Sequence, residues 1–298
     1  MSRAHLSVRL LKLSVFVLVL LSLIASVHAQ VVIDNLVDSS LIRDQVRFEF
    51  IGDRLVSLML NTFYLLAVIE FTWAMITLML RQAGMQAFLN TIVTRSLFIG
   101  FFSWLLTRGS ATASEIFQSF EQLAIATTLT DGAITPSNIM DHGQVMLARL
   151  YQEAISVGIF DSVFDPNKSL STPVLLLFIG MVAFVVMAII AAHFAVVLLE
   201  MFIAANAGII LLGLGASRWT YQYATAYLRY ALSVGMKLFV LSIVVGLTLD
   251  EIDRFFATAA IDEINNLMAL LAFILFAAVV SIIVPKSVKG MMDGVSVG

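Results

Sequence analysis

The feature that most constrains this chain is an apolar run too long for any soluble core. Residues 173–216 contain only His193 and Glu200 as ionisable side chains. As one α-helix the run would be about 65 Å long, because each residue advances the helix by about 1.5 Å. The hydrocarbon core of a bilayer is only about 30 Å thick. The run therefore predicts a membrane-embedded segment that contains a bend or a hairpin.

The composition of the whole chain also favours lipid as its solvent. Hydrophobic residues make up 60% of the 298 residues and charged residues only 12%, about half the charged fraction of a globular domain. The net charge of −3 argues against wrapping nucleic acid by bulk electrostatics. The absence of cysteine excludes disulfides and thiolate metal sites. We expect an all-α, polytopic transmembrane helical bundle of about five spans.

The N-terminus has the pattern of a secretory signal peptide over residues 1–29. A basic stretch with Arg3, Arg9 and Lys12 precedes a short apolar segment at residues 13–24, and small residues follow at Val27 and Ala29. Twelve apolar residues reach only about 18 Å, which is short for a stable anchor. An uncleaved N-terminal anchor is the alternative.

The remaining chain divides by hydropathy and charge. We expect a polar segment at 30–54, followed by a transmembrane hairpin at 55–106 with spans 55–80 and 91–106. An acidic region of amphipathic helices near the bilayer surface follows at 107–172. The chain then continues with a transmembrane core at 173–284, which ends at Pro285, and a tail at 285–298.

The distribution of lysine and arginine predicts the topology. Short basic segments contain Arg81 with Arg95, Arg218 with Arg229, and Lys286 with Lys289, while the segments between them are acidic. The positive-inside rule then places the basic turns and the C-terminus inside, and segments 30–54, 107–172 and 250–263 outside. This alternation needs five crossings. We therefore expect residues 174–198 to cross once and residues 201–216 to be re-entrant or interfacial.

Three ionisable side chains inside predicted spans are candidate sites. Glu70 should face protein or water, because a charge at the bilayer centre costs roughly 2.5–3.5 kcal/mol on insertion scales. Its possible roles are an ion or proton site, a contact in a subunit interface, or simply a buried hydrogen-bonding residue. Lys237 is its candidate partner. His193 has no second ligand at helical spacing and is more typical of a buried polar residue. Arg95 can be explained by snorkelling of its side chain to the interface.

Small residues mark a candidate packing or oligomer interface. They are frequent near the end of the long apolar run, and small side chains let helix backbones approach closely. The candidates are Ala204, Gly208, Gly213 and Gly215. Known catalytic, nucleotide-binding and metal-binding motifs are missing from the sequence, so we expect no enzyme activity and no cofactor.

Taken in order, these features resemble the TrbL family of conjugative-transfer proteins, the VirB-six-like inner-membrane subunits of type IV secretion systems. The resemblance rests on the intramembrane acid near Trp73, on Pro136-Ser137, and on the segment Gly-Leu-Gly-Ala-Ser-Arg-Trp-Thr at 213–220. It extends through the tyrosine-rich start of the next span, 221–230, to Lys237-Leu238-Phe239.

The resemblance implies a non-catalytic channel or scaffold subunit in the bacterial inner membrane, with a periplasmic N-terminus and a cytoplasmic C-terminus. The implied partners are scaffold proteins, secretion ATPases, pilus subunits, further copies of the chain, and the transferred DNA or protein. In that setting Arg218, Trp219, Thr220 and Arg229 become candidate contacts at the cytoplasmic rim. They are equally well explained as positive-inside anchors with an aromatic belt.

A small-molecule or ion transporter is the competing class. Charged groups within spans, namely Glu70, His193 and Lys237, fit a transporter. The two halves of the chain show no convincing repeat, and the long acidic region is unusual for a simple carrier. A membrane enzyme is disfavoured by the missing catalytic motifs.

Overall fold

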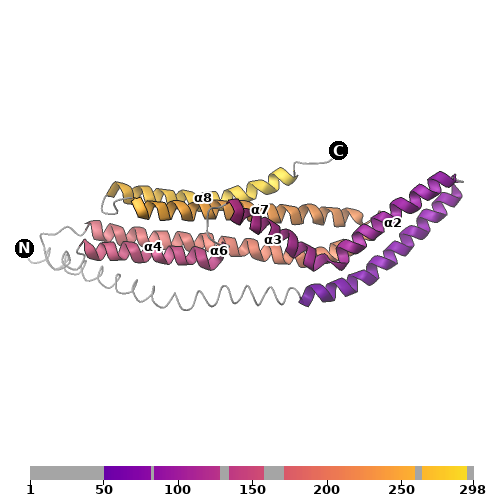
Figure 1. The fold of residues 1–298 in the computed structure, drawn as a ribbon, viewed down its shortest axis with the longest axis horizontal. Coiled ribbons are helices and arrows are strands. Elements are labelled where there is room, and N and C mark those ends of the chain that lie inside the picture. Colours follow the sequence, from indigo (N-terminus) through magenta and orange to yellow (C-terminus); the bar gives the residue numbers. More distant parts are fainter. Residues whose placement is uncertain (1–49, 82–83, 128–133, 158–170, 259–263, 294–298) are drawn as a thin grey trace, which may run out of the picture. The chain divides into compact units, whose positions relative to one another are not determined.

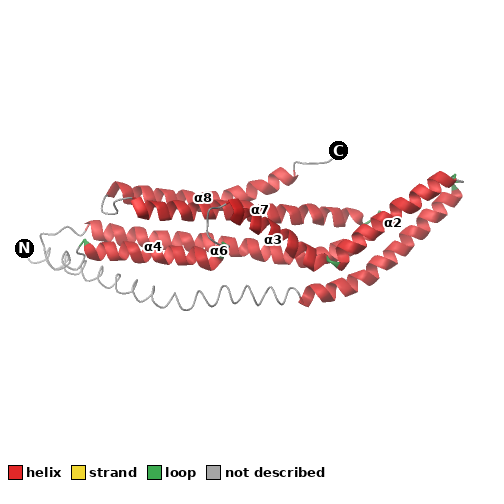
Figure 2. Ribbon diagram, in the orientation of Figure 1, coloured by secondary structure: helices red, strands yellow, loops and turns green. Residues whose placement is uncertain are grey.

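A computed structural model describes residues 50–81, 84–127, 134–157, 171–258 and 264–293. The predicted signal peptide and most of the polar segment 30–54 lie outside the described residues, as does the end of the C-terminal tail. Within the described ranges the chain is almost entirely helical and contains no strand (Figures 1 and 2). The predicted all-α fold is confirmed.

The helices follow the hydropathy pattern closely. A helix at Phe50–Leu80 is followed by α2 (Met85–Thr107), α3 (Gly109–Thr127), α4 (Pro136–Ser156), α6 (Ser171–Gly213), the short 3-10 turn η1 (Leu214–Ala216), α7 (Tyr221–Thr258) and α8 (Ile264–Asp293). Five of these are long and apolar enough to cross a membrane: Phe50–Leu80, α2, α6, α7 and α8. The chain is therefore a multi-pass membrane protein, and its described residues contain the predicted number of spans.

The long apolar run forms one continuous helix and not a hairpin. α6 continues without interruption for 43 residues, so residues 201–213 are part of the same helix and not a separate re-entrant segment. The run contains no internal proline after its start, and its glycines pack against other helices: Gly208 against Tyr227 of α7 and Gly213 against Met59 of the Phe50–Leu80 helix. The consequence is a helix of about 64 Å, twice the thickness of the hydrocarbon core.

Two other predicted helix ends also differ from the structure. α8 passes through Pro285 and continues to Asp293, where we expected it to end at that proline. A proline inside a helix removes one backbone hydrogen bond, and such a residue bends a helix more often than it ends one within membranes. α7 likewise extends to Thr258, so the first part of the predicted acidic loop is helical.

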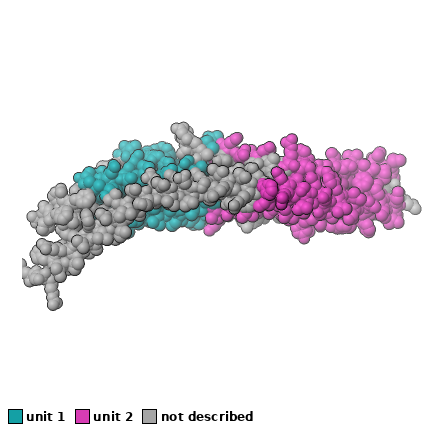
Figure 3. Space-filling view, turned by 90° about the horizontal axis from the view of Figure 1, so that it is seen from below, with its two compact units in different colours: residues 1–40, 125–195, 240–284 teal, residues 41–124, 196–239, 285–298 magenta. Residues whose placement is uncertain are grey.

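Two compact units can be distinguished along the chain, and Figure 3 colours them separately. In the first unit, α4 packs on residues 171–195 of α6 and residues 240–258 of α7. Gly143 of α4 lies against Met187 of α6, and His142 of α4 lies 3.6 Å from the Asp253 carboxylate of α7. α4, which lies in the region predicted to hold amphipathic helices at 107–172, thus buries its apolar face against protein. Its start is fixed by Thr135, whose side chain accepts a hydrogen bond from the Asn138 backbone N–H, and by Pro136 in the first turn.

The second unit contains the hairpin of Phe50–Leu80 and α2, together with α3 up to residue 124, residues 196–213 of α6, η1, and residues 221–239 of α7. Its core gathers large side chains from four of the five spans: Phe63, Phe102, Leu106, Ile209, Leu212 and Tyr227. The site described next lies entirely within this unit.

Candidate functional site

Glu70 is a buried carboxylate in the interior of the Phe50–Leu80 helix. Only 1% of the residue is exposed. It lies ten residues before Leu80, and therefore about 15 Å from the end of the hairpin. Because a buried ionised carboxylate is stable only when it is paired, its surroundings must supply positive charge or hydrogen bonds.

Two arginines supply that charge. Arg95 Nη1 of α2 lies 2.9 Å from Glu70 Oε1, and Arg218 Nε lies 3.5 Å from the same oxygen. The Arg95 side chain is 25% exposed and that of Arg218 41%. One carboxylate thus faces two guanidinium groups, and the group as a whole carries an excess positive charge.

Ser217 completes the group from the turn between η1 and α7. Its hydroxyl donates to Glu70 Oε2 at 3.3 Å, and its oxygen accepts the backbone N–H of Trp219, also at 3.3 Å. The Ser217 carbonyl accepts the N–H of Tyr221, and the Thr220 hydroxyl donates to the Leu214 carbonyl. We call Glu70, Arg95, Ser217 and Arg218 the Glu70 junction. It ties the Phe50–Leu80 helix, α2 and the α6–α7 turn together.

Small residues allow this close approach. A Cβ atom on Gly213 would lie 2.9 Å from the Met59 Cβ, and one on Gly215 would lie 2.6 Å from a ring carbon of Phe102. Distances below about 3 Å are not tolerated by real side chains without movement, so both glycines let the turn pack against the hairpin.

Gly208 has a similar role between α6 and α7. A Cβ there would overlap the Tyr227 ring, which is itself buried in the core. Ala204 is buried beside Val234. The predicted small-residue interface therefore provides packing within the chain at these four positions.

The predicted pair of Glu70 and Lys237 does not form. Lys237 instead makes an ion pair with Glu200 of α6, whose second oxygen accepts a hydrogen bond from the Tyr230 hydroxyl at 3.3 Å. The physical reason is that Glu70 and Lys237 lie at different distances from the α6–α7 turn. Glu70 is level with the turn at Ser217, whereas Lys237 lies sixteen residues into α7, about 24 Å from its start.

The ion pairs Glu70–Arg95 and Glu200–Lys237 could have been predicted from the distance of each residue to its turn. In an antiparallel hairpin, residues equally distant from the turn lie side by side. Arg95 lies ten residues after Met85, just as Glu70 lies ten residues before Leu80. Glu200 and Lys237 are likewise at similar distances from the Ser217 turn. The sequence suggested that Arg95 snorkels to the interface. Its ion pair with Glu70 explains its position instead.

The other candidate residues are not part of the Glu70 junction. His193 is half-buried on the part of α6 that belongs to the first unit. Arg229 is exposed on α7. Trp219 is exposed beside the junction, where its ring lies 6.1 Å from that of Trp73 and under the Arg218 guanidinium.

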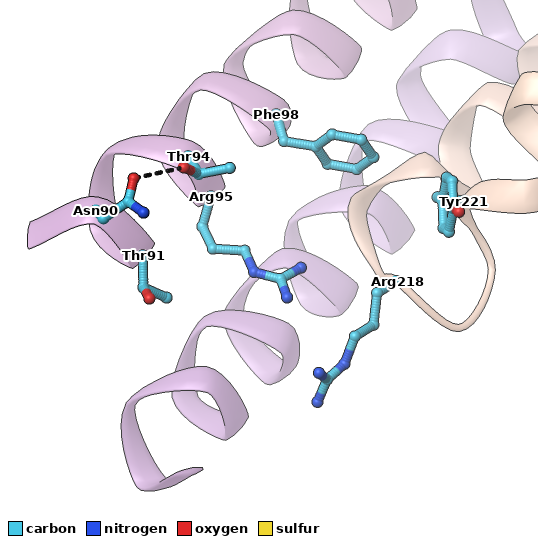
Figure 4. Close-up of a pocket in the computed structure, with 7 residues that line it drawn as sticks. All are labelled: Asn90, Thr91, Thr94, Arg95, Phe98, Arg218 and Tyr221. Atoms are coloured by element: carbon cyan, nitrogen blue, oxygen red, sulfur yellow. Dashed lines mark hydrogen bonds between the residues drawn. The ribbon is translucent and has the colours of Figure 1, made fainter. Parts of the chain in front are cut away.

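A pocket of about 460 Å³ opens beside the junction. Figure 4 shows the side chains of Arg95 and Arg218 approaching the same space, the first from α2 and the second from the turn. The remaining lining residues are Asn90, Thr91, Thr94, Phe98 and Tyr221. Within the described part of the chain, no group of histidine and acidic residues has the arrangement of a metal site.

Comparison with known proteins supports the resemblance seen in the sequence. The family described as TrbL/VirB6 plasmid conjugal transfer protein matches residues 67–286. A probable conjugal transfer protein TrbL of Sinorhizobium fredii is 30% identical over 239 residues, which is 80% of this chain and 58% of the relative. A conjugal transfer protein TrbL of Rhizobium radiobacter is 30% identical over 240 residues, with the same coverage of each chain. The chain thus spans somewhat more than half the length of these relatives.

Proposed function

This chain belongs to the TrbL/VirB6 family of plasmid conjugal transfer proteins, and on that premise we propose that it is an inner-membrane channel or scaffold subunit of a type IV secretion apparatus. The observation that carries the proposal is the extent of the family match, residues 67–286. It includes all residues of the Glu70 junction and reaches into each of the five spans. In this role the protein carries out no chemistry and holds its helices in the path of the transferred DNA or protein.

Exposed apolar surface on α6 supports assembly with other subunits. Large apolar side chains are exposed along this helix from Phe178 to Ile210, a length of about 48 Å. The hydrocarbon core of a bilayer is about 30 Å thick. If α6 were tilted by about 40°, at the upper end of the observed range, its exposed apolar region would still extend about 37 Å along the bilayer normal. The hydrocarbon core is therefore too thin to cover the whole exposed region. Further copies of the chain, or other secretion subunits, would cover the remainder.

The orientation that we propose has the N-terminus in the periplasm and the C-terminus in the cytoplasm. Its support is the positive-inside pattern together with the five spans. Secretion ATPases would then meet the protein on the side of the basic turns, and pilus and scaffold subunits on the side of α4.

The Glu70 junction argues against the transporter alternative. A cation carrier needs a carboxylate that solvent and substrate can reach. Glu70 is almost fully buried, and one oxygen faces two arginines while the other accepts a hydrogen bond from Ser217. This arrangement is that of an internal structural group, not of an open ion site.

The test is conjugation from a donor strain that lacks the gene. We expect loss of plasmid transfer at normal growth, and restoration by the wild-type gene. Arg218→Gln and the matched variant Arg229→Gln, compared at equal protein level, test the Glu70 junction. We expect Arg218→Gln to restore transfer poorly and Arg229→Gln to restore it fully. Unchanged transfer in the deletion strain, together with a defect in solute uptake, would contradict the proposal and favour a transporter.

A further inference from the structure

We infer that the pocket beside the Glu70 junction binds the phosphate of an anionic phospholipid. The pocket is lined by two arginines and by no acidic residue. Its volume of about 460 Å³ lies within the range of small-ligand sites, about 300–1,000 Å³. This inference goes beyond the proposed function and does not depend on it.

The charge balance of the junction calls for an anion. Glu70 neutralises only one of the two guanidinium groups that approach it, so one positive charge is left at the pocket wall. A net charge beside apolar surface is costly unless a counter-charge accompanies it. One phosphodiester would balance the group. Guanidinium is well suited to the purpose because its planar N–H groups match phosphate oxygens.

Polar groups on α2 define the rest of the headgroup site. The Thr94 hydroxyl donates to the Asn90 side-chain oxygen at 3.5 Å (Figure 4). The Asn90 amide N–H groups are not used in this bond and can donate to a ligand in the pocket. Tyr221 provides a phenolic hydroxyl from the opposite wall. These groups suit the glycerol hydroxyls and the phosphate oxygens of a headgroup.

The surroundings favour a lipid over free phosphate as the source of the anion. Exposed aromatic side chains lie beside the pocket, and such amphipathic rings are typical of surfaces that contact lipid headgroups: Trp73, Trp219, Tyr221 and Tyr223. Farther along α2, away from the hairpin end, Leu97 and Phe101 are exposed and offer an apolar surface to acyl chains. Basic pockets between helices on the cytoplasmic side are typical binding sites for anionic headgroups.

The test measures lipid binding to the purified full-length protein. Native mass spectrometry would compare phosphatidylglycerol with phosphatidylcholine of the same acyl chains. We expect phosphatidylglycerol to bind about tenfold more tightly. Arg218→Gln should lower its affinity about five- to tenfold, since one basic residue near a membrane surface contributes roughly 1 kcal/mol. Phosphatidylcholine binding should not change, and the matched variant Arg229→Gln should behave as wild type.

A second variant guards against misfolding of Arg218→Gln. Asn90→Asp keeps the side-chain size, leaves the Glu70 junction intact, and places a negative charge in the pocket, so it should weaken phosphatidylglycerol binding to a similar degree. Equal binding of the two lipids, or wild-type binding by Asn90→Asp, overturns the inference. Displacement of the lipid by glycerol phosphate at equal concentration would make the site one for a free phosphate. Displacement by a single-stranded oligonucleotide would make it a nucleic-acid site. Either result also overturns the inference.

Discussion

Replacing the buried carboxylate tests whether the Glu70 junction holds the second unit together. Glu70→Gln preserves shape but removes the negative charge that two arginines share. At an effective dielectric constant of about 20, the observed separations give attractions of roughly 6 kcal/mol for Arg95 and roughly 5 kcal/mol for Arg218, before the cost of removing these groups from water. Because Arg218 is 41% exposed, water screens its contribution further.

Desolvation offsets much of that attraction, so the net effect must be smaller. Loss of one partner from a buried ion pair commonly destabilises a protein by about 3–5 kcal/mol. We therefore expect Glu70→Gln to lower the free energy of unfolding by about 3–5 kcal/mol. Reversible unfolding in mixed micelles, followed by tryptophan fluorescence, is a suitable assay because Trp73 and Trp219 lie beside the junction.

Two further variants make the measurement specific. Glu115→Gln removes an exposed carboxylate from α3 and should change stability by less than about 0.5 kcal/mol. The double variant Glu70→Gln/Arg95→Gln should be less destabilised than Glu70→Gln alone, because the more buried guanidinium is then no longer unpaired. The reasoning is refuted by a Glu70→Gln protein as stable as Glu115→Gln, or by additive effects in the double variant.

Three other outcomes are expected. Gly208→Val should destabilise the protein by about 3 kcal/mol or more, because the new side chain overlaps the Tyr227 ring, and adding Tyr227→Leu should recover part of the loss in the same unfolding assay. Glu200→Gln should lower stability by less than Glu70→Gln does, because the Glu200 carboxylate is less buried and faces one cation and not two, and a loss as large as that of Glu70→Gln would contradict this. Since the chain has no cysteine, single-cysteine variants can report topology in whole cells. An impermeant thiol reagent should label Ser119→Cys and leave Arg81→Cys unlabelled until the inner membrane is opened, and the reverse pattern would invert the proposed orientation.

Hydropathy and local capping signals were enough to place the helices. The two spans of the hairpin, predicted at 55–80 and 91–106, end within one residue of the observed helices and begin five and six residues after the observed starts. The errors arose where a local signal was overruled by packing. Pro285 was expected to end α8, and the length of the apolar run was expected to require a bend or a hairpin within it.

Side-chain partners were harder to predict because they depend on helix rotation and on the height of one helix beside another. Sequence showed that Glu70 needed a partner but favoured Lys237, the lysine in a span, over the arginines nearer the turns. Distance from the hairpin end would have identified Arg95. Arg218 could not be found in this way, because its approach to Glu70 depends on how the α6–α7 turn packs against the first hairpin.

The unbroken length of α6 gives the α6–α7 turn mechanical leverage. An uninterrupted helix of 43 residues behaves as a stiff rod with only gentle curvature. Tilting a rod of about 64 Å by about 10° around one end moves the other end by about 11 Å. A small change in the tilt of such a helix therefore becomes a large displacement of its far end, without any hydrogen bond of the helix being broken.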